Sequence, residues 1–127
     1  MLWNWTPGGR EDEFVTFGAK HVRFWRGRNG RWAPQGPQWG AAAPQDVNCA
    51  AFLPLGLVAT GHPSGEVYLW RDRRVARTVV LHPGPAGGLG VGCMKLHVNK
   101  ADARVALVTA GGDGRVRLHD LWGGLLI

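Results

Sequence analysis

Three side chains in the sequence carry the groups of a hydrolase triad. His82, Thr109 and Asp113 supply an imidazole, a hydroxyl and a carboxylate. No nucleophile-elbow or oxyanion-donor pattern accompanies them, so we do not expect catalysis from this set. The same groups can satisfy one another's hydrogen bonds inside a folded unit. We therefore expect a structural role for all three, and no enzyme activity.

A second group of candidate residues is basic. The chain has 12 Arg and 3 Lys against 9 acidic residues, a formal charge of +6, and six of the arginines closely follow Trp25 or Trp70. Arginine makes planar, bidentate contacts to carboxylates, so these side chains predict a basic rim for an acidic protein partner. We expect them in loops on one face. They are Arg26, Arg28, Arg31, Arg71, Arg73 and Arg74.

Two other interpretations of these arginines compete with protein binding. They could be solvated turn residues that only add solubility. They could also bind nucleic acid, but the sequence predicts no recognition helix, and the nearby Trp32 and Trp39 are equally suited to covering a sheet edge. We therefore expect a protein partner, and neither nucleic acid nor a small-molecule substrate.

The cysteines and remaining histidines do not form a metal-binding pattern. Cys49 and Cys93 lie 44 residues apart with no CxxC pair, and they occupy equivalent positions in two similar segments. This placement predicts two small, buried strand residues. His21, His62 and His97 lack metal-ligand spacing. We expect no metal and no cofactor.

The elements that position these residues must be short. The 127-residue chain contains 20 Gly, 8 Pro and 7 Trp. An interior Gly costs a helix about 1 kcal/mol and an interior Pro about 3 kcal/mol, so long helices are disfavoured. No apolar run reaches the roughly 20 residues of a membrane span, and the first ten residues lack the layout of a secretion signal. We expect an all-β protein located in the cytoplasm.

A repeat organises the chain. Three segments of similar sequence are spaced by 45 and 49 residues: Val22–Trp25, Val67–Trp70 and Val116–His119. Each follows a turn that is preceded by a β-like run ending in Gly, and this order predicts a hairpin in every unit. The three runs are Phe14–Gly18, Leu57–Gly61 and Leu107–Gly111.

Further strands complete the units. Val47–Phe52 aligns with Val91–Leu96, and Arg74–Leu81 supplies a fourth strand for the second unit, whereas Ala33–Pro44 is expected to be an irregular connection. Both faces of the strand Val67–Trp70 are apolar, as in a sheet packed between two others. Four short strands per unit and a period near 45 residues are typical of β-propeller blades.

These units resemble WD40 repeats. In the third unit, Leu107–Asp120 resembles the family's sequence of turn Asp, Gly, strand and Trp-Asp, with His119 in place of the usual Trp. The second unit has Ser64, and the first has Ala19, where the turn Asp is expected. The resemblance implies that His82, Thr109 and Asp113 form a structural hydrogen-bonded set. It also implies that Trp25 and Trp70 anchor the packing of the blades.

Within this class the sequence is most similar to the echinoderm microtubule-associated protein-like family. The segments Phe14–Gly18, His21–Trp25, Thr60–Trp70 and His82–Pro85 carry the similarity, which spans roughly residues 10–122. It implies a non-catalytic interaction module that binds tubulin or microtubules and is located on the cytoskeleton or in cilia. The alternative is a WD40 scaffold subunit of another complex, without tubulin binding.

The chain also departs from that family. It has no counterpart of the family's N-terminal coiled coil or of the hydrophobic motif before the propeller. About two and a half blades are expected, whereas closed propellers have roughly four to eight. We therefore expect a fragment of a larger propeller. Its units are a partial blade at 1–45, a second blade at 46–82 and a third at 83–127 whose outer strand is incomplete.

Overall fold

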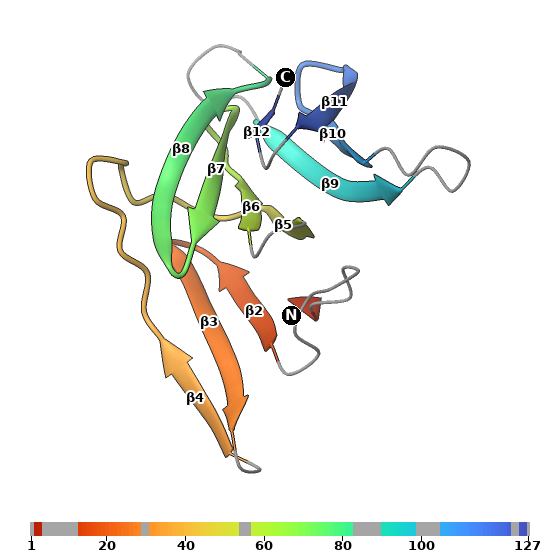
Figure 1. Cartoon of the computed structure of the whole chain (residues 1–127). Coiled ribbons are helices and arrows are strands. Elements are labelled where there is room, and N and C mark those ends of the chain that lie inside the picture. Colours follow the sequence, from red (N-terminus) through yellow and green to blue (C-terminus); the bar gives the residue numbers. More distant parts are fainter. Residues whose placement is uncertain are drawn as a thin grey trace.

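The computed structural model describes residues 2–3, 13–28, 31–53, 57–82, 90–98, 105–122 and 125–126. They form three four-stranded antiparallel sheets with the strands in chain order (Figure 1). None of the described residues belongs to a helix that could cross a membrane. The first sheet contains β1 (Leu2–Trp3), β2 (Glu13–Gly18), β3 (His21–Arg28) and β4 (Arg31–Gln35); the second contains β5 (Cys49–Leu53), β6 (Leu57–Gly61), β7 (Glu66–Arg71) and β8 (Arg74–Val80); the third contains β9 (Val91–Val98), β10 (Val105–Gly111), β11 (Val116–Trp122) and β12 (Leu125–Leu126).

The three predicted hairpins are confirmed. Strand β2 pairs with β3, β6 with β7 and β10 with β11, and each pair closes at the predicted turn. In the first hairpin Lys20 adopts a φ of 49°, and in the third Gly114 adopts a φ of 76°. These left-handed conformations reverse the chain within a few residues, which is why the strands can stay short.

The expectation of two and a half units is corrected to three four-stranded sheets. Strand β1, which the sequence analysis did not identify, pairs with β2 through Leu2 opposite Val15 and Trp3 opposite Phe14. Strand β12 likewise completes the third sheet. Both strands have two residues, and so short a strand has no alternating pattern that could predict it.

The predicted loop after Trp25 is also corrected. Strand β3 continues to Arg28, and the first three residues of the expected irregular connection, 33–35, belong to β4. Contacts with both neighbouring strands hold β3: Arg26 Nε lies 3.2 Å from Glu13 Oε1 on β2, and the ring of Trp32 on β4 covers Gly27. The charged residues after Trp25 resemble a loop in the sequence because the partners that hold them in a strand lie on other strands.

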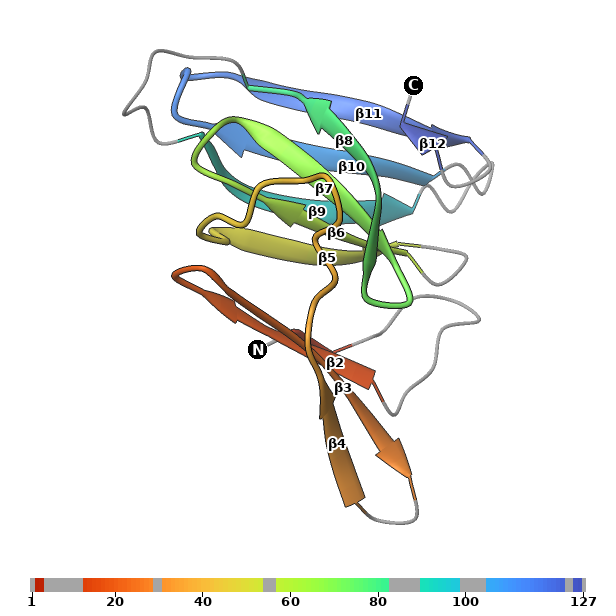
Figure 2. The ribbon, with the colours of Figure 1, turned by 90° about the vertical axis from the view of Figure 1, so that its left-hand side faces the viewer.

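The first three strands of the second sheet are buried on both faces, whereas β8 is mostly exposed. This confirms the expectation from the apolar residues on both faces of β7. Val67 and Leu69 are 0% and 2% exposed and belong to a core shared with the third sheet, whereas Tyr68 and Trp70 belong to a core shared with the first. Figure 2 shows the three sheets as successive layers. Each fully buried large side chain contributes roughly 1.5–3 kcal/mol, so the second sheet is the centre of stability.

Backbone and side-chain hydrogen bonds join neighbouring sheets near the start of each inner strand. The Val47 N–H donates to Gly18 O at 2.9 Å, and the Val91 N–H donates to His62 O at 3.0 Å. Asn48 Nδ2 donates to Val91 O at 3.0 Å. The second and third sheets are therefore each fixed, at the start of their first strand, to the hairpin of the sheet before them.

The connection between the first two sheets covers an edge. Gln38 N donates to Arg73 O at 2.7 Å, and Val75 N donates to Gln38 O at 3.2 Å. The Trp39 ring packs edge-on to Trp70 with centroids 5.0 Å apart. A bare edge strand exposes unpaired N–H and C=O groups, so this segment protects β8 at one point of its length.

Candidate functional site

Each sheet contains a hydrogen-bonded relay centred on a threonine. In the second sheet, Trp70 Nε1 donates to Thr60 Oγ1 at 2.8 Å, and Thr60 Oγ1 lies 2.7 Å from His62 Nε2. His62 Nδ1 lies 2.9 Å from Asp46 O. A carbonyl oxygen only accepts, so Nδ1 carries the proton and Nε2 accepts from the threonine hydroxyl. The neutral histidine satisfies every group in this relay.

The relay of the third sheet contains the three residues singled out from the sequence. Thr109 Oγ1 lies 2.7 Å from His82 Nε2, and His82 Nδ1 lies 3.0 Å from Asp113 Oδ1. His119 occupies the position of Trp70, with its Nε2 3.4 Å from Thr109 Oγ1. Asp113 also accepts from the Arg115 N–H at 3.0 Å, which fixes the turn.

The first sheet has a shorter version of the relay. Trp25 Nε1 donates to Thr16 Oγ1 at 3.1 Å, and Thr16 Oγ1 lies 3.1 Å from His21 Nε2. In all three sheets the ring that donates, or stands in the donor position, follows the threonine by nine or ten residues. The same spacing is present in the sequence, but a structural role was predicted for Thr109 and for no other threonine. The residues it missed are Thr16, Thr60, His21, His62 and His119.

Burial of the relays favours a structural role over a catalytic one. It lowers the pKa of His62 and of His119, so both rings favour the neutral form, whereas the hydrogen bond from His82 lowers the pKa of Asp113. Thr109 is 0% exposed and His82 is 2% exposed. A substrate cannot approach a hydroxyl that is enclosed in this way, so the triad-like set has no open side for nucleophilic attack.

The two cysteines differ in exposure, so the prediction that both are buried is wrong for Cys93. Cys49 packs in the core between the second and third sheets, and burial raises its pKa to about 12. Cys93 is exposed on β9. It pairs with Ala110 on a face that no other described sheet covers. Within the described ranges, no three His, Cys, Asp or Glu side chains gather into a metal-binding group.

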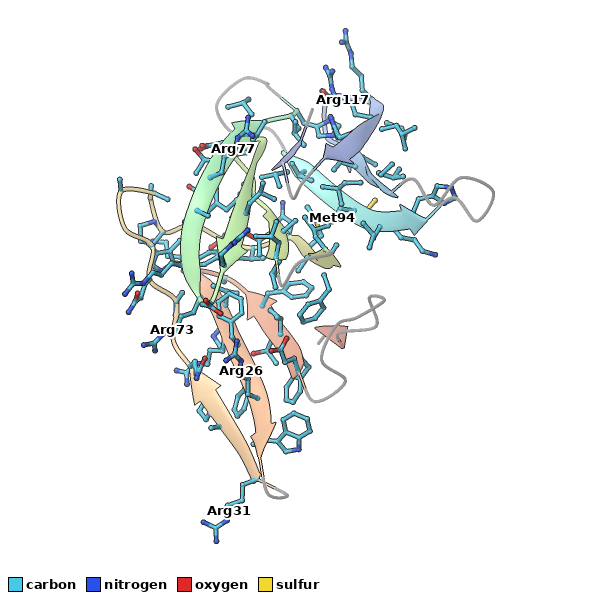
Figure 3. All side chains as sticks on the ribbon, viewed as in Figure 1. Arg26, Arg31, Arg73, Arg77, Met94 and Arg117 are labelled. Carbon is cyan, nitrogen blue, oxygen red and sulfur yellow. The ribbon has the colours of Figure 1, made fainter. Side chains whose placement is uncertain are left out.

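The six candidate arginines do not gather as closely as expected. Arg26 and Arg73 border the same small cavity, whereas Arg31 lies at the far tip of the β3–β4 hairpin (Figure 3). Arg28 also belongs to this end of β3, but its side chain lies outside the described part of the chain. Because β3 and β4 extend past the predicted loop, they carry Arg31 away from the second sheet.

The cavity lies at the junction of the first two sheets. Its volume is about 30 Å³, room for roughly one water molecule, and it is lined partly by Trp25 and Trp70. Arg26 closes the junction through ion pairs with Glu13 at 3.2 Å and Asp72 at 3.4 Å. Arg26 therefore joins the two sheets, and its charge is neutralised locally.

Three arginines at the β7–β8 hairpin remain exposed at this junction. Arg71, Arg73 and Arg74 border one surface depression, and Arg74 Nε donates to Gln38 Oε1 at 2.6 Å. Asp72 and Arg73 form the turn with φ values of 54° and 75°, a conformation that normally favours Asn or Gly. Arg73 is exposed in this turn. We call these three residues the arginine strip.

Comparison with known proteins concerns the fold. No protein-family model matches the chain. Among solved structures, the chain is similar to the computationally designed Ika4 protein, with a TM-score of 0.55 and 18% sequence identity. The match covers 90% of this chain and 63% of the designed one. The likeness supports the all-β architecture. The chain spans less than two thirds of the length of the designed protein.

Proposed function

We propose that this chain is a run of three WD40-type blades that serves as a non-catalytic protein-interaction module of the cytoskeleton. Its arginine strip binds the acidic tails of tubulin. The observation that carries the binding proposal is the exposure of Arg71, Arg73 and Arg74 at one hairpin end. The choice of tubulin as the partner rests on the sequence resemblance to the microtubule-associated family. The proposed location in the cytoplasm, in cilia or on microtubules rests on the same resemblance.

Three features support the assignment of the sheets as blades. The strands follow the same order in every sheet. The second sheet is apolar on both faces. The threonine relay recurs with the same ring spacing, although His119 replaces the tryptophan in the third sheet. A propeller needs the shared strand order and the two apolar faces, because each of its blades packs between two neighbours. The recurring relay supports the assignment because it marks the three sheets as copies of one unit.

Charge supports an acidic protein partner. Among the described residues, no carboxylate lies within ion-pair distance of Arg71, Arg73 or Arg74. Arg26, in contrast, forms ion pairs with Glu13 and Asp72. Guanidinium groups bind carboxylates through two parallel hydrogen bonds, and several of them on one rim raise the rate of encounter with an acidic peptide. The small cavity at the junction is far below the 300 Å³ or more of common ligand pockets.

Co-sedimentation with microtubules tests the proposal. The chain is expected to pellet with intact microtubules at low salt and to be released as salt is raised, because exposed charges are screened. Removing the acidic tubulin tails by limited proteolysis should abolish pelleting. Reversing Arg71→Glu with Arg73→Glu should weaken binding by about tenfold, since each exposed pair contributes up to about 1 kcal/mol and reversal adds repulsion.

A charge-matched control distinguishes the effect of the arginine strip on binding from the effect of the chain's net charge. Arg77→Glu with Arg115→Glu makes the same change at two exposed arginines outside the strip and should leave binding within about twofold. Equal losses in the two double variants would remove the strip from the proposal. No pelleting at low salt would reject tubulin binding and favour the alternative, a scaffold subunit of another complex.

A further inference from the structure

We infer that the outer edge of strand β8 accepts an extended acidic segment of a protein partner as a fifth strand of the second sheet. This inference goes beyond the proposed tubulin site and does not rest on it. The strands of the second sheet follow the order β5-β6-β7-β8, so β8 pairs with β7 on one side only (Figure 1). On its other side, the described part of the chain provides a single bridge, at Gln38.

That bridge shows that the edge of β8 can hold an added main chain. Gln38 pairs with Arg74 in parallel orientation. Its N–H donates to Arg73 O at 2.7 Å, and its carbonyl oxygen accepts from the Val75 N–H at 3.2 Å. The next residue, Trp39, packs edge-on to Trp70 in the core between the sheets, so the connection does not continue along β8. The rest of the edge has no described strand beside it.

A bulge separates the covered part of this edge from the rest. The register of β8 against β7 shifts between Leu69 and Trp70, so Ala76 is an extra residue without a partner in β7. Beyond the bulge, residues 77–80 pair with β7 in regular register. We call residues 77–80 the open edge.

Two residues of the open edge direct their backbone groups away from β7. Leu81, the residue after the strand, donates its N–H to Gly65 O at 3.0 Å on the β7 side. Backbone groups alternate in direction along an antiparallel strand, so the N–H and C=O of Val80 and Thr78 point to the open side. Among the described residues, no backbone group outside the sheet bonds to either of them. An extended peptide added as a strand would pair with these four groups.

The open edge is accessible and lacks the usual protection of an edge strand. Arg77, Thr78 and Val80 are exposed. Threonine and valine are β-branched, and such side chains pack well against a neighbouring strand. The outer strand of the first sheet differs, because β4 contains Pro34, which has no N–H and discourages an added strand. The open edge contains no proline.

Charge favours an acidic segment over a second copy of this chain. Arg74 and Arg77 are exposed on β8, and no described carboxylate lies within ion-pair distance of Arg77. Side chains directly opposite on paired strands lie about 5 Å apart, so an Asp or Glu of the added strand can reach the Arg77 guanidinium. Two β8 strands placed edge to edge would bring their arginines together, and like charges oppose such pairing.

Backbone-modified peptides test strand addition on the unaltered 127-residue chain. The probe is a fluorescently labelled peptide, Val-Thr-Val-Glu-Val-Thr with blocked ends, and fluorescence anisotropy should detect its binding below about 1 mM. Methylating every second backbone nitrogen removes the N–H donors on one side of the extended peptide. Of the two alternately methylated peptides, one should lose at least about tenfold in affinity and the other should stay within about twofold. No binding of the parent peptide, or equal binding of both methylated peptides, would overturn the inference.

Hydrogen exchange locates the added strand without any substitution. The outward amides of Thr78 and Val80 should exchange at least about tenfold more slowly when the probe is bound, because they become hydrogen-bonded. The amide of Val79, which faces β7, should change little. Unchanged exchange at Thr78 and Val80 in the presence of bound probe would place the peptide elsewhere.

A proline substitution tests the same backbone group. Thr78→Pro removes an outward N–H and no hydrogen bond to β7, so it should weaken probe binding by at least about tenfold. Thr78→Val keeps the N–H and should bind within about twofold of the parent chain. Circular dichroism of both variants must match the parent chain. Full binding by a folded Thr78→Pro variant would contradict strand addition at the open edge.

Charge reversal tests the preference for an acidic segment. Arg77→Glu should weaken binding of the probe by about tenfold, whereas Arg115→Glu, at an exposed residue outside β8, should stay within about twofold. Equal losses would show that net charge, and not Arg77, attracts the peptide. Arg77 lies outside the arginine strip, so microtubule binding succeeds or fails independently of this result.

Discussion

The second and third sheets have closely similar sequences and contrasting surroundings. Val67 and Leu69 in β7 are fully buried, whereas Val116 and Leu118 at the equivalent positions in β11 are the most exposed apolar side chains that the structure describes. The burial of a residue in this chain is therefore set by the neighbouring sheet and not by its own strand. The same contrast affects the relays, which are enclosed around Trp70 and looser around His119.

The contrast also explains why the third sheet tolerates departures from the repeat. His119 replaces a tryptophan and makes a 3.4 Å contact to Thr109 where Trp70 makes a 2.8 Å bond to Thr60. In compensation, His82 donates to Asp113, which itself caps the turn through the Arg115 N–H.

The largest expected difference between the sheets is in the stability lost when equivalent leucines, Leu69 and Leu118, are replaced by alanine. Leu69→Ala should lower the free energy of unfolding by about 2–5 kcal/mol, because it leaves a cavity in a closed core. Leu118→Ala should change it by less than about 0.5 kcal/mol, because the side chain is mostly solvated. Urea unfolding measures both values. Equal losses would contradict the contrast in burial.

A smaller difference is expected between the threonines of the two relays. Thr60→Val should cost about 2 kcal/mol, because it leaves the buried Trp70 N–H and His62 Nε2 unpaired. Thr109→Val should cost about 1 kcal/mol, because its contact with His119 is already long. Thr78→Val, at an exposed position in β8, serves as the control in the same unfolding measurement. A larger loss at Thr109 would reverse our ranking of the relays.

Lowering the pH should reduce the stability of the protein in two successive steps. Burial lowers the folded-state pKa of His62 and His119 below the value of 6.5 in an unfolded chain, so the unfolded state binds more protons at acidic pH. Their contribution to stability is complete above about pH 6.5 and is lost as the pH falls below that value. Thermal unfolding from pH 8 to 5 should show this loss, and His62→Gln should reduce it. An unchanged pH dependence in His62→Gln would exclude this relay as its source.

At still lower pH the third sheet should weaken again. The hydrogen bond from His82 lowers the folded-state pKa of Asp113 below 3.8, so its contribution is present above that pH and is lost as the pH falls further. Asp113→Asn should remove this second step while leaving the His62 step in place. A second step that persists in Asp113→Asn would assign it to another carboxylate.

The smallest expected effect lies in the turns. Arg73 adopts a φ of 75° in the β7–β8 turn, whereas Gly114 has a φ of 76° in the β10–β11 turn at no steric cost. Asp72→Asn with Arg73→Gly should raise the free energy of unfolding by about 0.5–1 kcal/mol. Because Asp72→Asn removes one negative charge and Arg73→Gly removes one positive charge, the net charge of the chain is unchanged. A destabilised double variant would show that the Arg26–Asp72 ion pair outweighs the strain of the turn.

Strong local patterns made much of the fold predictable. Strand β6 matches the predicted Leu57–Gly61 at both ends, and β7 exceeds the predicted Val67–Trp70 by one residue at each end. The set of His82, Thr109 and Asp113 was expected from the resemblance to WD40 repeats, and its hydrogen bonds are present. These elements have clear alternation, turn residues or both.

Elements without such patterns escaped prediction. Strand β4 reads Arg-Trp-Ala-Pro-Gln, in which Pro34 and two polar residues disguise a strand that is held by its partner β3. The arginines were expected to converge because a loop was assumed after Trp25. The register of β3 against β2 instead keeps Arg26 beside Glu13 and carries the hairpin tip outward.

The sequence by itself determined the three hairpins and most of the longer strands, because these depend on the alternation of side chains and on turn residues close along the chain. Of the relays, only that of the third sheet was predicted, and it joins His82 to residues 27 and 31 positions away. The tertiary structure alone decided which apolar faces are buried and which arginines remain exposed. Val67 and Val116 cannot be told apart by their strands, and neither can Arg26 and Arg73 by their charge. Burial and ion pairing depend on groups that only the packing of one sheet against another brings near.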